Sequence, residues 1–262
     1  MTPESKIASQ PTNAAPEAAP HGFFSRLIGV YFSPGETFQE VGRAPRILTP
    51  ILATIIIGAL LGFLVINRVG VENLAGKQIE QAVQSGQLTQ EQATQRLEAM
   101  KSGPVAIFIK GSIILTFAFQ GLIIALVFAG IFKLLSMLMG VDNDFRPVLS
   151  VTLYALLAVS IISSLLFVIL LYLKSPEEID IQNLVGSNLR AILLAVGLDN
   201  LPKFLLALAR WIDLFAIWII ALLAIGYAAV SRRLKTSTAA MIIGGIYAVI
   251  ALIGALWTSL RG

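Results

Sequence analysis

Few residues in this sequence have the types and spacing that catalysis or metal binding requires. There is no cysteine, and the single histidine, His21, lies in a polar stretch near the N-terminus. Disulfides, zinc sites and thiol catalysis are therefore excluded, and a Ser-His-Asp triad has only this isolated histidine to draw on. The long apolar stretches contain neither a catalytic pair nor a set of metal ligands. We therefore predict no catalytic residue, no metal and no cofactor, and a protein that is not an enzyme.

One carboxylate lies where a charge is costly. Asp213 stands between Trp211 and Trp218, directly before an apolar run. A carboxylate near hydrocarbon needs a partner or water, so Asp213 is a candidate functional residue. It is either an exposed interface residue beside Trp211 or a member of a structural or solute-coupled pair. The candidate partners are basic residues at its predicted level or one helical turn away: Lys110, Lys174 and Arg210.

An apolar stretch between Pro104 and Met139 is interrupted by Lys110 and Lys133 and contains one further polar candidate. Gln120 lies near its middle, where a hydrogen bond to another helix is the plainer interpretation and a solute contact the alternative. Lys110 lies near its start and is expected to extend its amine to the membrane surface. In an earlier apolar stretch, Gly58 and Gly62 are spaced to let another helix approach closely.

Residues 33 to 38 have the pattern of a helix start. Ser33 is a candidate cap, and Pro34 is preformed for the first turn. Glu36 is placed to return a hydrogen bond to the backbone amide of Ser33, which would complete a capping box. We predict a short helix through Phe38 that ends near Gly42. The segment before it, 22–32, is short and aromatic and carries one arginine, which favours a position in the membrane interface.

The composition requires lipid around the chain. Of 262 residues, 56% are hydrophobic and 13% are charged, whereas about 25% are charged in soluble domains. A soluble fold could not hide so much apolar surface. The net charge of +4 is carried mostly by residues at the ends of apolar stretches, where they set topology, so no nucleic-acid partner is expected.

The apolar stretches predict an all-α polytopic membrane protein with five transmembrane helices, interfacial or re-entrant helices, and a short soluble helical hairpin after the first span. Residues 1–21 are predicted to be a disordered tail, and 22–258 to form the membrane domain. Residues 184–209 are broken by turn residues, which favours two half-helices over a sixth span. The predicted spans are 47–66, 111–132, 148–173, 214–230 and 239–258, with the soluble insertion at 67–103.

The insertion and the basic residues complete this prediction. Thr89 and Gln92 form a second capping-box pattern before an apolar stripe that includes Ala93. The densest basic cluster, Arg232 to Lys235, directly follows the 214–230 span. A short basic segment at a span end marks the inner side of the membrane. We therefore predict that the N-terminus lies inside and the C-terminus outside.

Two short motifs give the arrangement a family resemblance. Phe-Ser-Pro-Gly-Glu-Thr-Phe at 32–38 precedes the spans, and the fourth span opens with Asp213-Leu-Phe-x-Ile-Trp218 and continues to Ile225-Gly226. This resembles the Yip family of five-span membrane domains, particularly its bacterial branch, over most of residues 22–258. The resemblance implies an all-helical bundle with a cytosolic N-terminus and adds Trp218 and Gly226 to the candidate residues. A bacterial cytoplasmic membrane is the expected location.

Three classes of function are open. The first is a non-enzymatic module that binds partners or organises the membrane, in keeping with eukaryotic relatives that associate with Rab GTPases in vesicle traffic. The second is a small-molecule or ion transporter or channel subunit, which Asp213, Gln120 and the broken segment around 197–202 would serve. The third, an intramembrane enzyme, lacks catalytic groups. Expected partners are the bilayer and a membrane or cytosolic protein; a homo-oligomer is a further alternative.

Overall fold

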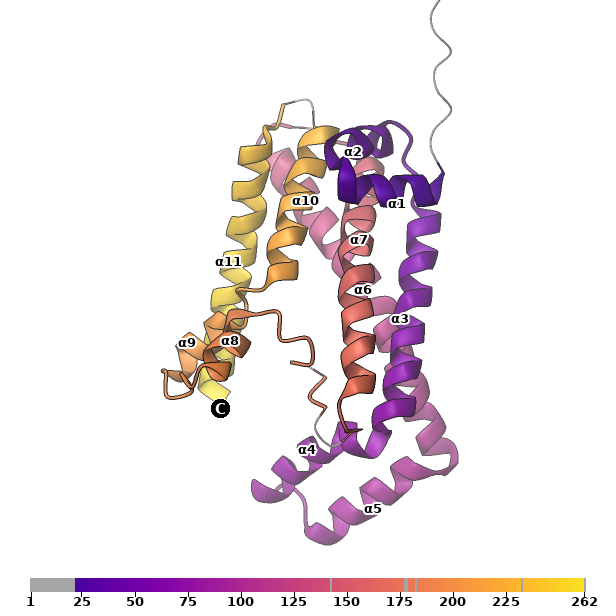
Figure 1. The fold of residues 1–262 in the computed structure, drawn as a ribbon, viewed down its shortest axis with the longest axis vertical. Helices are drawn as coiled ribbons and strands as arrows, with labels where there is room; N and C mark the ends of the chain where they lie inside the picture. Colours follow the sequence, from indigo (N-terminus) through magenta and orange to yellow (C-terminus); the bar gives the residue numbers. More distant parts are fainter. Residues whose placement is uncertain (1–21, 142, 177–178, 182, 232, 262) are drawn as a thin grey trace, which may run out of the picture.

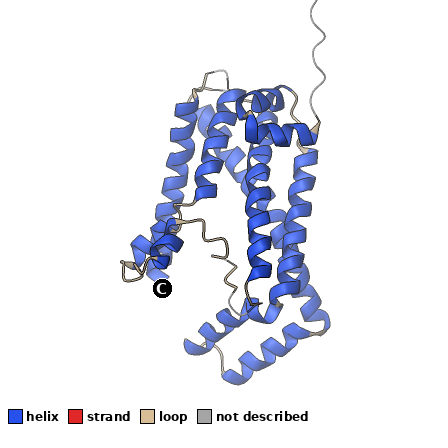
Figure 2. Ribbon diagram, viewed as in Figure 1, coloured by secondary structure: helices blue, strands red, loops and turns tan. Residues whose placement is uncertain are grey.

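A computed structural model of the chain describes residues 22–141, 143–176, 179–181, 183–231 and 233–261. The predicted tail over 1–21 and Arg232 of the basic cluster lie outside the described residues. The described residues form helices and no strand (Figure 2). In chain order the helices are α1 (Phe23–Phe32), α2 (Pro34–Arg43), α3 (Leu48–Val69), α4 (Val71–Gln84), α5 (Gln90–Lys101), α6 (Gly103–Leu138), α7 (Phe145–Leu173), α8 (Leu189–Ala195), α9 (Lys203–Ala209), α10 (Leu214–Val230) and α11 (Thr236–Arg261).

Apolar helices of alternating direction form a bundle. Within the described chain, α3, α6, α7 and α11 are each long and apolar enough to cross a membrane. The 17-residue α10 is apolar throughout and lies between α7 and α11 (Figure 1); its length of about 26 Å is somewhat less than a bilayer core of about 30 Å. The predicted fold class, an all-α polytopic membrane protein, is confirmed, and the count of five spans stays a prediction.

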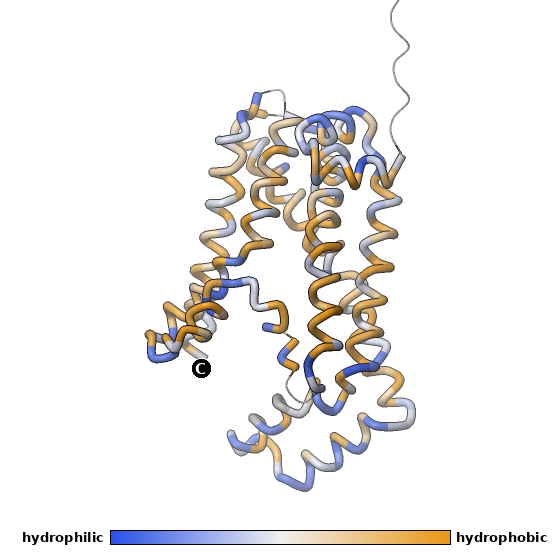
Figure 3. The backbone as a smooth tube through the Cα atoms, viewed as in Figure 1, coloured by the Kyte–Doolittle hydropathy of each residue, from blue (hydrophilic) through white to orange (hydrophobic). Residues whose placement is uncertain are grey.

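The bundle has two distinct ends (Figure 1). We call the end that carries α1 and α2 the hairpin end, and these two helices the N-terminal hairpin. The opposite end carries α4 and α5 and is called the insertion end. Figure 3 shows that α4 and α5 are largely hydrophilic, whereas the bundle helices are hydrophobic over most of their length. The insertion therefore has the polarity of a segment outside the membrane.

The second predicted span, 111–132, does not end where a helix ends. It is part of one helix, α6, of 36 residues, about 54 Å long. Pro104 does not break this helix because it lies in the first turn, where its missing amide is not needed. Lys110 and Lys133 do not break it either, because a lysine is a good helix former.

The predicted close helix approach is confirmed, and its partner is α6. A Cβ on Gly58 would overlap the carbonyl oxygen of Phe117 and lie 2.9 Å from the Cα of Ala118. A Cβ on Gly62 would lie 3.0 Å from the Cα of Ile114. The two glycines thus let the backbones of α3 and α6 touch, and van der Waals contact over this length stabilises the pair.

One of the two predicted helix caps is formed and the other is not. Thr89 and Gln92 form the expected capping box, with bonds of 3.0 and 3.2 Å. Ser33 precedes α2, but its side chain makes no capping bond. Ser33 is the single residue between two helices, and its amide already donates to the carbonyl of Gly29 at 2.8 Å. The amide is therefore unavailable to Glu36, and the predicted capping box is not formed.

Candidate functional site

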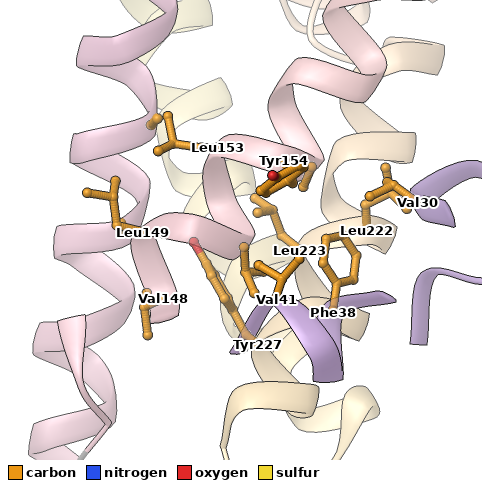
Figure 4. Packing of buried hydrophobic residues seen from close by; sticks show 14 of the residues in the cluster. Val30, Phe38, Val41, Val148, Leu149, Leu153, Tyr154, Leu222, Leu223 and Tyr227 are labelled. Atoms are coloured by element: carbon orange, nitrogen blue, oxygen red, sulfur yellow. The ribbon is translucent and has the colours of Figure 1, made fainter. Parts of the chain in front are cut away.

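The N-terminal hairpin closes one end of the bundle, and two residues chosen from the sequence meet there. Phe38 of α2 is completely buried. A Cβ on Gly226 of α10 would lie 3.3 Å from the Phe38 ring and would overlap Val151 of α7. Figure 4 shows Phe38 among side chains of the same cluster, including Val41 and Leu223. Gly226 is required here because three helices meet with no space for a side chain.

A second contact joins α1 to α10 and α7. The rings of Tyr31 and Trp218 lie 6.0 Å apart between centroids. The Tyr31 hydroxyl donates to the carbonyl oxygen of Ala158 at 2.6 Å. Burial raises the pKa of Tyr31 above its ordinary value, so the phenol remains a donor at neutral pH. Trp218 therefore contacts the hairpin through the ring of Tyr31.

An internal ion pair fixes α1 on α2. Arg26 is 1% exposed, and its Nε donates to Glu40 Oε1 at 3.0 Å. Its Nη1 donates to the carbonyl oxygen of Ala44 at 2.9 Å. Because a buried guanidinium must be paired, this contact holds the hairpin in one geometry. Sequence reasoning placed Arg26 in the interface and missed the pair; the one available signal was a single charge in the apolar segment 22–32.

The outer face of α1 is apolar. Phe24, Ile28 and Phe32 are spaced four residues apart and are 75%, 57% and 83% exposed. We call these three residues the α1 stripe. The helix lies across the ends of the bundle helices rather than along them (Figure 1). A helix in this position can bury such a stripe at the boundary between headgroups and acyl chains, which agrees with the interfacial position expected for residues 22–32.

A cavity of about 920 Å³ opens beside the hairpin. Its walls come from the end of α2, the turn between α6 and α7, and the turn between α10 and α11. Arg43 and Arg233 bring positive charge to it, and Asp144 brings negative charge. Asn143 and Ser231 also line it, and the buried Nδ2 and Oγ atoms of these residues have no hydrogen-bond partner in the described chain. The cavity therefore suits a polar partner.

Asp213 is held by hydrogen bonds at the start of α10. Asp213 Oδ1 accepts from the amide of Ala216 at 3.0 Å, and Oδ2 accepts from the hydroxyl of Ser187. Among the residues that the structure describes, no ion pair joins Asp213 to Lys110 or Lys174. The carboxylate is satisfied locally because α10 begins at the next residue and offers its first amides. Of the two alternatives for Asp213, the structure therefore shows local hydrogen bonds at the start of α10 and no ion pair with either lysine.

Two loops meet at Asp213. Asp213 forms an isolated antiparallel bridge with Asn188, and the amide of Leu189 donates to the carbonyl oxygen of Ile212 at 2.8 Å. Asn188 caps α8 as Asp213 caps α10. Beside this junction lies a cavity of about 300 Å³ whose walls include Ser163, Ser164 and Ser187 together with the aromatic residues Phe117, Phe167 and Phe215.

The remaining candidates are scattered. Gln120 is exposed on the bundle surface, and no hydrogen bond joins its side chain to another helix in the described chain, so the predicted bridge was wrong. Gln120 faces outward because Ala118, two residues away, occupies the side of α6 turned to Gly58. Lys110 and Glu36 are exposed, and Pro34 is the first residue of α2. Within the described residues, no group of three acidic or histidine side chains is placed to hold a metal ion.

Comparison with known proteins gives one match. A family model described as the Yip1 domain matches residues 28–258, nearly the whole chain. No curated protein and no solved structure matches. The matched region begins within α1 and extends into α11, so it includes the second half of α1, all of α2, the insertion and most of the bundle.

Proposed function

The chain belongs to the Yip1 domain family, and on that premise we propose that it is a non-enzymatic module that organises the membrane around its N-terminal hairpin. The observation that carries the proposal is the α1 stripe on a helix fixed across the end of the bundle. With the N-terminus inside, the stripe lies in the inner leaflet. The bundle then holds a wedge of apolar side chains at a constant depth in one leaflet.

The physical effect of such a wedge follows from its asymmetry. Burying one phenylalanine or isoleucine side chain in apolar surroundings contributes about 1.5–3 kcal/mol, so the stripe binds the interface firmly. Because the wedge expands one leaflet and not the other, it favours curvature toward that leaflet. The ion pair of Arg26 with Glu40 and the contact of Phe38 with Gly226 keep α1 from moving away.

Vesicle shape tests this function. In proteoliposomes with the hairpin end facing outward, so that the α1 stripe lies in the outer leaflet, the wild type is expected to shift the diameters seen by cryo-electron microscopy toward smaller vesicles. Replacing Phe24, Ile28 and Phe32 together by serine removes the wedge and should return the distribution to that of protein-free vesicles. The matched control replaces three exposed apolar residues of α6, Ile123, Val127 and Leu134, by alanine. Equal diameters for wild type and the α1 variant would refute the proposal.

The cavity at the hairpin end gives the same module a place for a partner. It lies next to α2, and it holds two arginines, one aspartate and two buried polar groups without partners in the described chain. A polar segment of a membrane or cytosolic protein would satisfy these groups. Binding there would join the partner to the wedge without requiring any chemistry.

A transporter or channel is the second candidate, and the junction at Asp213 favours it. The walls of the 300 Å³ cavity beside Ser187 include three serines among apolar side chains, and interrupted helices bind ions in many transporters. This candidate predicts that proteoliposomes take up Na⁺, K⁺ or protons faster than protein-free liposomes. It also predicts that Asp213→Asn, which keeps the shape of the cap, slows this uptake at least tenfold. Uptake equal to that of protein-free liposomes would exclude transport of these ions as the function.

A further inference from the structure

Gln120 is a polar side chain on the outer surface of α6. It is exposed, and its side chain makes no hydrogen bond in the described chain. The opposite side of the helix faces the bundle, where Ala118, Ala125 and Ala129 are buried. A Cβ on Gly58 of α3 would lie 2.9 Å from the Cα of Ala118. The amide of Gln120 therefore points away from the bundle, toward whatever surrounds the protein.

Gln120 lies near the middle of the membrane. The backbone of α6 just before it touches Gly58, which lies halfway along the 22 residues of α3. Such a helix is about 33 Å long, close to the hydrocarbon thickness of about 30 Å. Lys110 and Lys133, the basic residues on either side, lie about 15 and 20 Å away along α6. The amide is therefore far from both membrane surfaces.

An amide at this depth needs a partner. Its two N–H groups and its carbonyl oxygen are hydrogen-bonding groups, whereas lipid chains offer neither a donor nor an acceptor. The glutamine side chain is also too short to reach the headgroups, as a lysine near a helix end does. A polar amide in hydrocarbon without a partner is costly. The outer surface of α6 at Gln120 therefore favours contact with a protein group at the same depth.

A second copy of the chain supplies such a group. Copies of one membrane protein insert in the same direction, so the two-fold axis of a dimer lies along the membrane normal and the two α6 helices run parallel. Gln120 of one copy then meets Gln120 of the second at the same depth. Because a carboxamide is both donor and acceptor, each can donate to the carbonyl oxygen of the other. The residue is therefore complementary to itself.

The surface beside Gln120 allows two helices to approach. Thr116 and Ser112 lie one and two turns earlier and are exposed. Their hydroxyls donate to backbone carbonyls of α6, each at 2.8 Å, so these short side chains are satisfied without a partner. Ile123, one turn later, is 58% exposed. Between residues 111 and 132 α6 carries no charged side chain, so no like charges oppose the approach of a second copy.

We propose that the chain forms a two-fold symmetric dimer through α6, in which the Gln120 amides of the two copies are hydrogen-bonded to each other in the middle of the membrane. No residue of the N-terminal hairpin takes part, so the dimer does not rest on the proposed function. Its axis places the hairpins of both copies at the same membrane surface, and the two α1 stripes then lie in one leaflet.

Energy transfer between donor-labelled and acceptor-labelled copies in liposomes measures the association, with the labels on a cysteine introduced at Gln90, an exposed residue of the insertion. Copies with Gln120 are expected to associate more than chance proximity allows. Gln120→Leu should weaken the association about tenfold, and Gln120→Asn, which keeps an amide, should retain most of it. Ile123→Ala is the matched control: it removes apolar contact from the same face and should have a smaller effect than Gln120→Leu.

Cysteine cross-linking locates the contact. Oxidation should link two copies of the Thr116→Cys variant and not two copies of Leu115→Cys, because Leu115 is 58% exposed but lies about 100° further around the helix. Equal association with and without the Gln120→Leu change, or equal linking at the two cysteines, would overturn the proposal. A chain that stays monomeric at every protein-to-lipid ratio would also overturn it and would assign the amide to a different membrane protein. The same holds if Gln120→Leu lowers the melting temperature of the monomer in detergent, since Gln120 would then act within one chain.

Discussion

Replacing Gly58 by alanine is expected to force α3 away from α6 and to destabilise the bundle. The added methyl group would overlap the backbone of α6 at Phe117 and Ala118, and neither backbone atom can rotate away. Overpacking of this kind costs typically about 1–3 kcal/mol, and more where backbone must move. The measurement is the melting temperature of the purified protein in detergent, followed by tryptophan fluorescence.

The matched control for this change is Gly130→Ala in α6. A Cβ on Gly130 meets no atom within 4 Å, so only the intrinsic preference for alanine in a helix remains, and stability should be unchanged or slightly higher. Equal melting temperatures for Gly58→Ala and the wild type would mean that α3 and α6 do not touch at this point.

Glu40→Gln is expected to have the second large effect, which should be concentrated in the N-terminal hairpin. It removes the negative charge opposite Arg26, whose Nη2 is already buried without a partner in the described chain. Breaking a buried ion pair costs about 3–5 kcal/mol, and because Glu40 is 27% exposed, water offsets part of this. Hydrogen exchange should show α1 and α2 losing protection while α3 and α6 keep theirs.

Two further variants isolate the charge. Glu36→Gln changes an exposed carboxylate of the same helix and should leave exchange unaltered. Arg26→Met combined with Glu40→Gln removes both charges and should recover most of the lost stability, because an apolar side chain of similar length can fill the site. If the hairpin is equally protected in the Glu40→Gln and Glu36→Gln variants, the ion pair does not hold it.

Features set by local sequence could be predicted. The apolar helices follow from length and composition, and the capping box at Thr89 and Gln92 depends on residues three apart. Gly58 and Gly62 predicted that another helix approaches α3, because small residues at this spacing commonly let membrane helices pack closely. The sequence could not predict which helix approaches α3, since any apolar helix offers the same surface.

Features that depend on contacts distant in sequence could not be predicted. Ser33 fails as a cap because α1 ends at the preceding residue and takes its amide. Asp213 finds its partner in Ser187, 26 residues away, and no periodic pattern marks that pair. Phe38 was named from the pattern of a helix start and Gly226 from a family resemblance, and the contact of three helices at which they meet required the fold.

The depth of α1 in the membrane tests the central claim most directly. Because the chain has no cysteine, nitroxide labels can be placed singly at Phe24, Ile28 and Phe32, and at Gln39 on the exposed face of α2. Accessibility to oxygen, which concentrates in lipid, is compared with accessibility to a water-soluble nickel complex. The account predicts that the three α1 labels favour oxygen and that Gln39 favours nickel. Nickel accessibility at Phe24, Ile28 and Phe32 equal to that at Gln39 would place the stripe in water and contradict it.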